Sequence, residues 1–247
     1  MLVLPLLVIV VFSFGERAPA GGYVPALTLA QYANLLARFT AFKNTLLLAP
    51  AGTLAALLVA YPLAYFLAIK VSPKIRTILL VLVIIPFWTS ILIRTYDWIY
   101  ILGGRGIPNL LSLVGIVYGY LPLMVFPIYV SLEKLGQRLL EVSSDLGAPP
   151  WRTFLQVTLP LSIPGIATGC MLVFILLMGE FLIPALLGGG KVFFIGNALV
   201  DLFLQSRNLA YGSAVAVTLV MIMLVTVSLY MRLMMKASAR RDDVSLF

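Results

Sequence analysis

Residues 44–69, NTLLLAPAGTLAALLVAYPLAYFLAI, decide the fold class, because this stretch contains no charged side chain. The hydrocarbon core of a bilayer is about 30 Å thick and a helix rises about 1.5 Å per residue, so about 20 apolar residues cross it. The stretch therefore predicts a transmembrane helix. Three other charge-free intervals are long enough for the same prediction: residues 106–132, 153–179 and 208–231.

Two further segments are weaker candidates for membrane crossing. Residues 77–93 carry no charge, and the apolar pattern continues past Arg94 and Asp97 to about residue 102. Residues 1–14 are apolar but short; we interpret them as the outer part of a first span that starts upstream, with a signal-peptide core or a short tilted helix as alternatives. The sequence thus predicts an all-α polytopic membrane protein with about six transmembrane helices, in one domain over residues 1–247.

The composition excludes several classes of protein. Apolar residues make up 62% of the chain and charged residues 11%, whereas an average soluble domain has about 25% charged residues. With no histidine and one cysteine, Cys170, the chain excludes an internal disulfide, a Cys/His zinc site and a Ser/His catalytic pair, so we expect no metal site. The net charge of +8 is scattered between apolar runs. We therefore expect membrane lipid, and no nucleic acid, as a partner.

The distribution of basic residues predicts the orientation in the membrane, because Lys and Arg are enriched in cytoplasmic loops. If both termini are cytoplasmic, the inner segments hold ten Lys and Arg and the longer outer segments hold six. We therefore predict that both ends lie in the cytoplasm. The ten inner residues are Lys70, Lys74, Arg76, Lys134, Arg138, Arg152, Arg232, Lys236, Arg240 and Arg241.

Residues 133–164 are the long inner loop, with room for structure of its own. Gly147 favours the left-handed conformation that ends helices, and Pro149 and Pro150 stop one helix and start the next. The loop is therefore predicted to contain two short helices near the membrane surface. Apolar side chains follow one face of the second helix, at Trp151, Phe154, Leu155 and Leu159.

Three charged residues fall within predicted spans, and ionisable groups there usually face protein or water. We expect Glu180, Asp97 and Arg94 at similar depth in the outer half of the membrane, where the carboxylates guide a cationic solute. Cation–π surfaces for it are predicted at Tyr96, Trp98 and Phe181. Alternatively, Arg94 and Asp97 pair with one another or reach the outer interface, where the aromatic residues form a belt.

Five residues of the long loop share a spacing that resembles a known motif. Glu141, Gly147, Val157, Leu159 and Pro160 stand in register with the loop motif of binding-protein-dependent ABC importer permeases, in which Glu-Ala-Ala is followed by Gly and by an aliphatic residue before Leu-Pro. The sequence departs from that pattern where Val142 and Ser143 replace alanines, and where Val157 replaces isoleucine.

The resemblance extends over nearly the whole chain and is strongest to the polyamine branch of this family. It implies the first permease subunit type of a spermidine/putrescine importer, with a type I ABC importer permease fold in a bacterial inner membrane. The segments that carry it are YPLAYFLA at residues 61–68, RTYDW at 94–98, SLEKL at 131–135, GEF at 179–181, LGG at 187–189 and IGN at 195–197.

The same resemblance implies how the chain works. The loop of residues 133–164 would dock into a cytoplasmic ATPase dimer, through Glu141, Asp145, Leu146, Gly147 and Trp151. No GxxxxGK[ST] phosphate loop occurs in the sequence, so the chain is expected to be non-catalytic, without a cofactor of its own; ATP and Mg would bind to the ATPase.

Further partners are implied as well: a second, homologous permease and an extracytoplasmic solute-binding protein. A polyamine is the expected cargo; ferric iron, sulfate and amino-acid- or opine-like solutes are alternatives. A secondary transporter, a channel and a membrane scaffold are weaker alternatives, because none of them needs an ATPase-docking loop.

Overall fold

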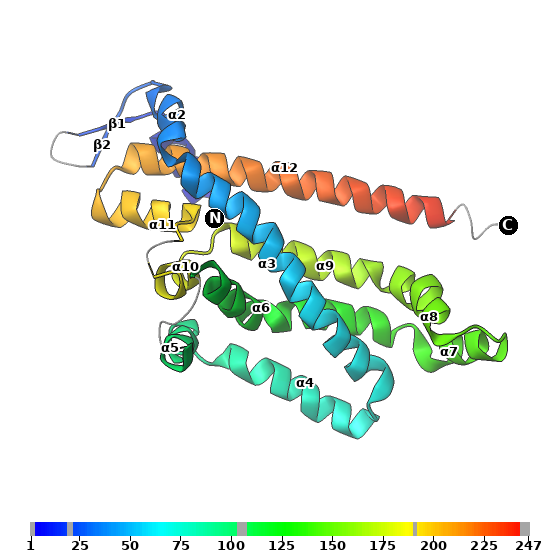
Figure 1. The fold of residues 1–247 in the computed structure, drawn as a ribbon. Coiled ribbons are helices and arrows are strands. Elements are labelled where there is room, and N and C mark those ends of the chain that lie inside the picture. The colour runs from blue at the N-terminus through cyan, green and yellow to red at the C-terminus, as the bar shows by residue number, and fades with distance from the viewer. Residues whose placement is uncertain (1–2, 19–21, 103–107, 190–191, 243–247) are drawn as a thin grey trace. The chain divides into compact units, whose positions relative to one another are not determined.

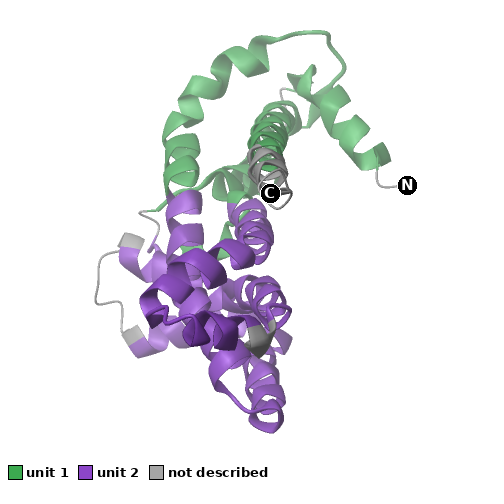
Figure 2. Cartoon of the chain, turned by 90° about the vertical axis from the view of Figure 1, so that its right-hand side faces the viewer, with its two compact units in different colours: residues 1–47, 178–185, 190–247 green, residues 48–177, 186–189 purple. Residues whose placement is uncertain are grey.

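The computed structural model describes residues 3–18, 22–102, 108–189 and 192–242, which are mainly helical (Figure 1). The chain forms two compact units (Figure 2). Unit 1 comprises residues 1–47, 178–185 and 190–247, and unit 2 comprises residues 48–177 and 186–189. The prediction of a single permease domain over 1–247, with the loop of 133–164 inside it, stays a prediction.

Unit 2 contains the helices around the long inner loop. Helix α3 (Phe39–Tyr65) begins in unit 1 and continues into unit 2. The elements that follow it are η2 (Phe66–Lys70), α4 (Pro73–Trp88), α5 (Ile91–Leu102), α6 (Pro108–Glu133), α7 (Gly136–Asp145), α8 (Pro150–Thr153), η3 (Phe154–Thr158) and α9 (Leu159–Met178).

Unit 1 combines both ends of the chain, since helix α1 packs along α12. Strands β1 and β2 form a small antiparallel hairpin in which Glu16 pairs with Val24. The elements of this unit are α1 (Val3–Ser13), β1 (Glu16–Arg17), β2 (Tyr23–Val24), α2 (Ala30–Ala33), η1 (Asn34–Arg38), the start of α10 (Leu182–Leu187), α11 (Ile195–Val200), η4 (Asp201–Gln205) and α12 (Leu209–Asp242).

The four strongest predicted spans are confirmed as long apolar helical segments. They cover Ala30–Lys70, Leu110–Glu133, Pro150–Met178 and Leu209–Arg232. The first predicted segment forms α1, which is 11 residues long and so shorter than these four. About six transmembrane helices were predicted. Among the described residues, they correspond to four long segments, one bent pair and α1.

The segment predicted to span the membrane from residue 77 to about 102 is formed by a bent pair of helices. Helices α4 and α5 meet at an angle of 93°. Thr89 is extended at ψ 150°, and its hydroxyl donates a hydrogen bond to the carbonyl of Pro86, 2.7 Å away. The predicted depth of Arg94 and Asp97 was counted along a straight helix, and it stays a prediction.

Small residues give unit 2 its close helix packing. Ala49, Ala56, Ala60 and Ala64 recur along one buried face of α3, and small side chains let helix backbones approach closely in membranes. In the same way α9 packs on α6, because a Cβ on Gly165 would collide with the carbonyl of Pro127. Apolar helices of this kind hold the inner loop at their ends.

Candidate functional site

The long inner loop contains the predicted break between two helices. Helix α7 ends at Asp145, and Gly147 takes the left-handed conformation with φ +75°. The Gly147 N–H donates to the carbonyl of Ser144 at 2.9 Å. Pro150 then opens α8, where its missing N–H costs no hydrogen bond. Glycine and proline therefore have the roles predicted from the sequence.

The second helix of the loop differs from the prediction. Helix α8 continues through the π-helical turn η3 into α9, so Pro150–Met178 is one helical segment rather than a short separate helix. Proline crowds the carbonyl four residues before it, and for Pro160 that residue is Gln156, inside the wider turn of η3. The π-turn thus accommodates Pro160 without ending the helix.

The loop exposes apolar side chains beside two carboxylates. Leu139, Val142 and Leu146 follow one stripe at i, i+3 and i+7, with exposed fractions of 47, 55 and 82%. Glu141 and Asp145 are exposed one turn apart next to this stripe. An apolar stripe rimmed by charge is typical of a surface that binds a partner protein.

Helices α7 and α8 are held together by a hydrogen bond of 2.8 Å between the hydroxyls of Ser143 and Thr153. Trp151 is 60% exposed, and the Arg152 guanidinium lies 5.3 Å from its ring centroid. The five residues predicted to contact an ATPase therefore lie exposed on one loop. Their contact with an ATPase stays a prediction.

Glu180, predicted to guide the solute, lies in unit 1 just after α9 ends. It is 7% exposed, and its Oε1 accepts hydrogen bonds from three backbone N–H groups, of Phe181 at 3.0 Å, Leu182 at 2.8 Å and Ile183 at 3.2 Å. A carboxylate in this position satisfies the free N–H groups at the start of a helix. Glu180 thus caps α10, a role that was not predicted from the sequence.

Residues 179–181 and 195–197, two segments that carry the family resemblance, meet at this cap. A Cβ added to Gly196 would come within 2.8 Å of the carbonyl oxygens of both Gly179 and Glu180, so only glycine permits this approach. The Asn197 Nδ2 donates to the carbonyl of Phe181 at 2.7 Å, and its Oδ1 accepts from the Phe194 N–H at 3.0 Å.

The start of α3 anchors the same cluster within unit 1. The buried Thr45 hydroxyl accepts a hydrogen bond from the Ile195 N–H at 2.9 Å. One residue earlier, the Asn44 Nδ2 donates to the carbonyl of Phe193 at 3.1 Å. These two residues were not predicted from the sequence, although polar side chains at the start of an apolar span were a signal for them.

The other predicted pathway residues lie on α5 in unit 2. Arg94 is 9% exposed, whereas Asp97 and Tyr96 are exposed. The described residues contain no ion pair between Arg94 and Asp97, so the alternative in which they pair is not seen. The Trp98 ring packs edge-on against Tyr118 at 5.5 Å. Because these residues belong to unit 2 and Glu180 and Phe181 to unit 1, their common pathway stays a prediction.

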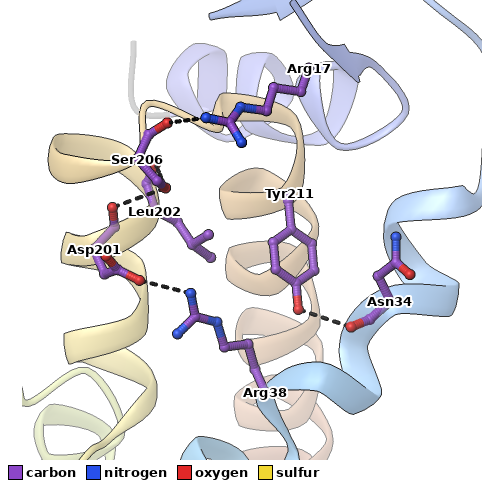
Figure 3. A network of polar contacts seen from close by, with 7 residues as sticks. All are labelled: Arg17, Asn34, Arg38, Asp201, Leu202, Ser206 and Tyr211. Atoms are coloured by element: carbon purple, nitrogen blue, oxygen red, sulfur yellow. Dashed lines mark hydrogen bonds and ion pairs between the residues drawn. The ribbon is translucent and has the colours of Figure 1, made fainter. Parts of the chain in front are cut away.

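A polar network at one end of unit 1 connects η1, η4, β1 and α12 (Figure 3). Arg38 forms an ion pair of 2.7 Å with Asp201, and Arg17 donates to the carbonyl of Ser206 at 3.1 Å. The Tyr211 hydroxyl donates to the carbonyl of Asn34 at 2.9 Å. This network orders the segments before α3 and α12, and Asp201 was not selected from the sequence.

Long apolar helices joined by an exposed loop define a polytopic membrane protein. The profile of the family described as "Binding-protein-dependent transport system inner membrane component" matches residues 60–241. The chain belongs to this family. It is a permease subunit of an ABC importer, and it is multi-pass in the inner membrane.

Curated relatives match almost the entire chain. The spermidine/putrescine transport system permease protein PotB of Haemophilus influenzae is 38% identical over 93% of this chain and 87% of the relative. PotB of Escherichia coli is 38% identical over 93% of this chain and 90% of the relative.

A solved structure confirms the fold class. A chain of the bacterial ABC transporter involved in the import of the acidic polysaccharide alginate aligns with a TM-score of 0.73 at 17% identity. The alignment covers 94% of this chain and 89% of that one. This similarity supports the predicted type I importer fold.

Proposed function

We propose that the solute moved by this permease subunit is a polyamine such as spermidine or putrescine, imported into the cytoplasm by alternating access. The observation that carries the proposal is the 38% identity, over 93% of the chain, to permeases named for spermidine and putrescine. Ferric iron, sulfate and amino-acid- or opine-like solutes are the alternatives.

The chain is proposed to act without catalytic chemistry of its own. The coupling loop, residues 133–164, docks on a cytoplasmic ATPase dimer that binds ATP and Mg, with both chain termini in the cytoplasm. Its exposed apolar stripe and the neighbouring carboxylates of Glu141 and Asp145 support this role. A second, homologous permease and an extracytoplasmic solute-binding protein complete the proposed importer.

The solute pathway is proposed to use carboxylates and aromatic rings. Asp97 and Glu180 attract the polycation, and Tyr96, Trp98 and Phe181 offer aromatic faces to it. Arg94, on the same helix as Asp97, is included among the pathway residues. The exposed positions of Asp97, Tyr96 and Phe181 support their access to solute.

The cargo is tested by ATP hydrolysis of the reconstituted importer with its binding protein. We expect spermidine and putrescine to stimulate hydrolysis, and ferric iron, sulfate and amino acids to leave it at its basal rate. Stimulation by one of the other solutes alone would overturn the polyamine proposal and would leave the permease class intact.

The conformation of Gly147 gives a second prediction. A side chain in the left-handed region costs about 1–2 kcal/mol, and asparagine tolerates it best. No atom lies within 4 Å of a Cβ built on Gly147, so a substitution acts through the backbone alone. Gly147→Val is therefore expected to lower solute-stimulated ATP hydrolysis about tenfold.

Gly147→Asn is the matched control, because its side chain fills the same open space without the same backbone strain. We expect it to retain most of the stimulated hydrolysis. Equal activity of the two variants would show that the left-handed turn does not position the loop.

A further inference from the structure

One arginine joins the base of the coupling loop to the end of α3, within unit 2. Its Nη1 lies 3.4 Å from Oε1 of Glu133, the last residue of α6, which leads into α7. Its Nη2 donates to the carbonyl of Ala68 at 2.9 Å and to that of Val71 at 3.3 Å, where the π-turn η2 extends α3. This arginine is Arg76, in the first turn of α4.

The geometry of Glu133 is fixed from a second side. The Tyr129 hydroxyl, one turn earlier on α6, donates to the same Oε1 at 2.6 Å. The side chain of Arg76 is 18% exposed and that of Glu133 is 48% exposed. An ion pair with this exposure and distance adds little to stability. The contact therefore contributes little to the free energy of unfolding. Its importance is that it connects α4 and the end of α3 to the end of α6.

A cavity borders this connection, beside the direct packing of η2 against α6. A cavity of about 540 Å³ lies between the α3–α4 turn and the base of the loop, lined by Ala68 and Val71 on one side and by Leu132, Leu135 and Leu140 on the other. Arg76 and Glu133 are part of its wall. Arg76 thus offers a polar connection between the base of the loop and the end of α3, in addition to the packing of η2 on α6.

The second helix of the coupling loop contacts the same helix, α3. The Phe154 ring packs edge-on against Tyr61 and Tyr65, with both centroid distances 5.9 Å. Phe154 opens the π-turn η3, and Tyr65 precedes the π-turn η2. π-Turns within helices are frequent at functional sites. Both ends of the loop thus converge on the last turns of α3.

We propose that Arg76 is a positioning residue that transmits movement of the coupling loop to the end of α3, by holding Glu133 and the carbonyls of Ala68 and Val71 at once. The inference rests on the proposed docking of the loop on an ATPase. It does not depend on which solute is carried. Arg76 sets the geometry between two helices and does not contact the solute.

The test compares Arg76→Ala with Lys74→Ala in assembled complexes, because Lys74 is an exposed cation in the same first turn of α4. Hydrogen exchange is measured with and without a non-hydrolysable ATP analogue, at residues 66–71 and, as internal reference, at residues 139–145. In the wild type and in Lys74→Ala we expect the nucleotide to change exchange in both segments.

In Arg76→Ala the nucleotide response is expected to persist at residues 139–145 and to fall at residues 66–71. The amount of solute transported per ATP is expected to drop about 2- to 30-fold. A merely structural arginine would change exchange at residues 66–71 equally with and without nucleotide. A wild-type response at residues 66–71 in this variant overturns the proposal, as does the lack of such a response in the wild type.

Glu133→Gln decides the proposal where Arg76→Ala does not assemble. The amide keeps an acceptor for Tyr129 and removes the charge that faces Arg76, so we expect a smaller loss of the same nucleotide response; an unchanged response overturns the proposal. Failure of the polyamine proposal is distinct, because it appears as unstimulated hydrolysis in the wild type, whereas the exchange experiment needs nucleotide alone.

Discussion

Replacing Glu141 by alanine is expected to weaken binding of the ATPase to this permease by about 10- to 150-fold. Hydrogen bonds to a charged group contribute about 1.5–3 kcal/mol, and each 1.4 kcal/mol is a factor of ten in affinity. Glu141 is exposed beside the apolar stripe of α7, so its truncation leaves the fold of the loop intact. The measurement is the dissociation constant of the purified ATPase from the reconstituted permease.

Two matched variants separate the charge from the position. Glu141→Gln keeps the shape and the acceptor, and we expect an intermediate affinity because neutral hydrogen bonds are about half as strong. Glu16→Ala removes an exposed carboxylate from strand β1 in unit 1 and is expected to leave affinity unchanged. If Glu141→Ala binds the ATPase as tightly as the wild type, the docking proposal fails.

Features that depend on neighbours in the chain were predicted well from the sequence. The long helices follow from charge-free intervals, since an apolar backbone in a bilayer must satisfy its hydrogen bonds within a helix. The break in the loop follows from Gly147 and Pro150, whose conformations are restricted by their own covalent structure. In each case the information lies within a few residues.

Features that depend on distant contacts were not predicted. The bend between α4 and α5 has a local signal in Pro86, since proline can kink a helix, but its angle was not predicted. The pairing of Arg76 with Glu133 spans 57 positions, and the meeting of Gly196 with Gly179 depends on the path of α10 and α11. No local pattern contains the information for these two distant contacts.

The predicted site residues also divide into those that the pattern along the chain explains and those that only contacts in the structure explain. Glu141 was selected by the spacing of the loop motif, and Asp145 and Trp151 as contacts that the family resemblance implies. The structure places all three on an exposed loop. Glu180 was selected because it is a lone charge in an apolar run, and the structure places its carboxylate on three backbone N–H groups. A lone charge in a span thus marks a polar site, and only the contacts show what the site does.

Replacing Glu180 by alanine is expected to prevent assembly of the importer. The change removes the acceptor for the N–H groups of Phe181, Leu182 and Ile183, in a residue that is 7% exposed. Each buried donor left without a partner costs about 1–3 kcal/mol. The start of α10 and the packing of Gly196 against Glu180 are then lost together. The measurement is the yield of complex that copurifies with the ATPase.

Glu180→Gln separates the cap from the proposed attraction of a polycation. The amide oxygen still accepts from the backbone, so we expect this variant to assemble. Its lost charge is expected to lower polyamine transport about tenfold, since attraction of a cation by a partly desolvated carboxylate is worth more than 1.4 kcal/mol. Normal transport by an assembled Glu180→Gln importer would show that Glu180 acts through the cap of α10 alone. The pathway proposal would then rest on Asp97 and the aromatic residues.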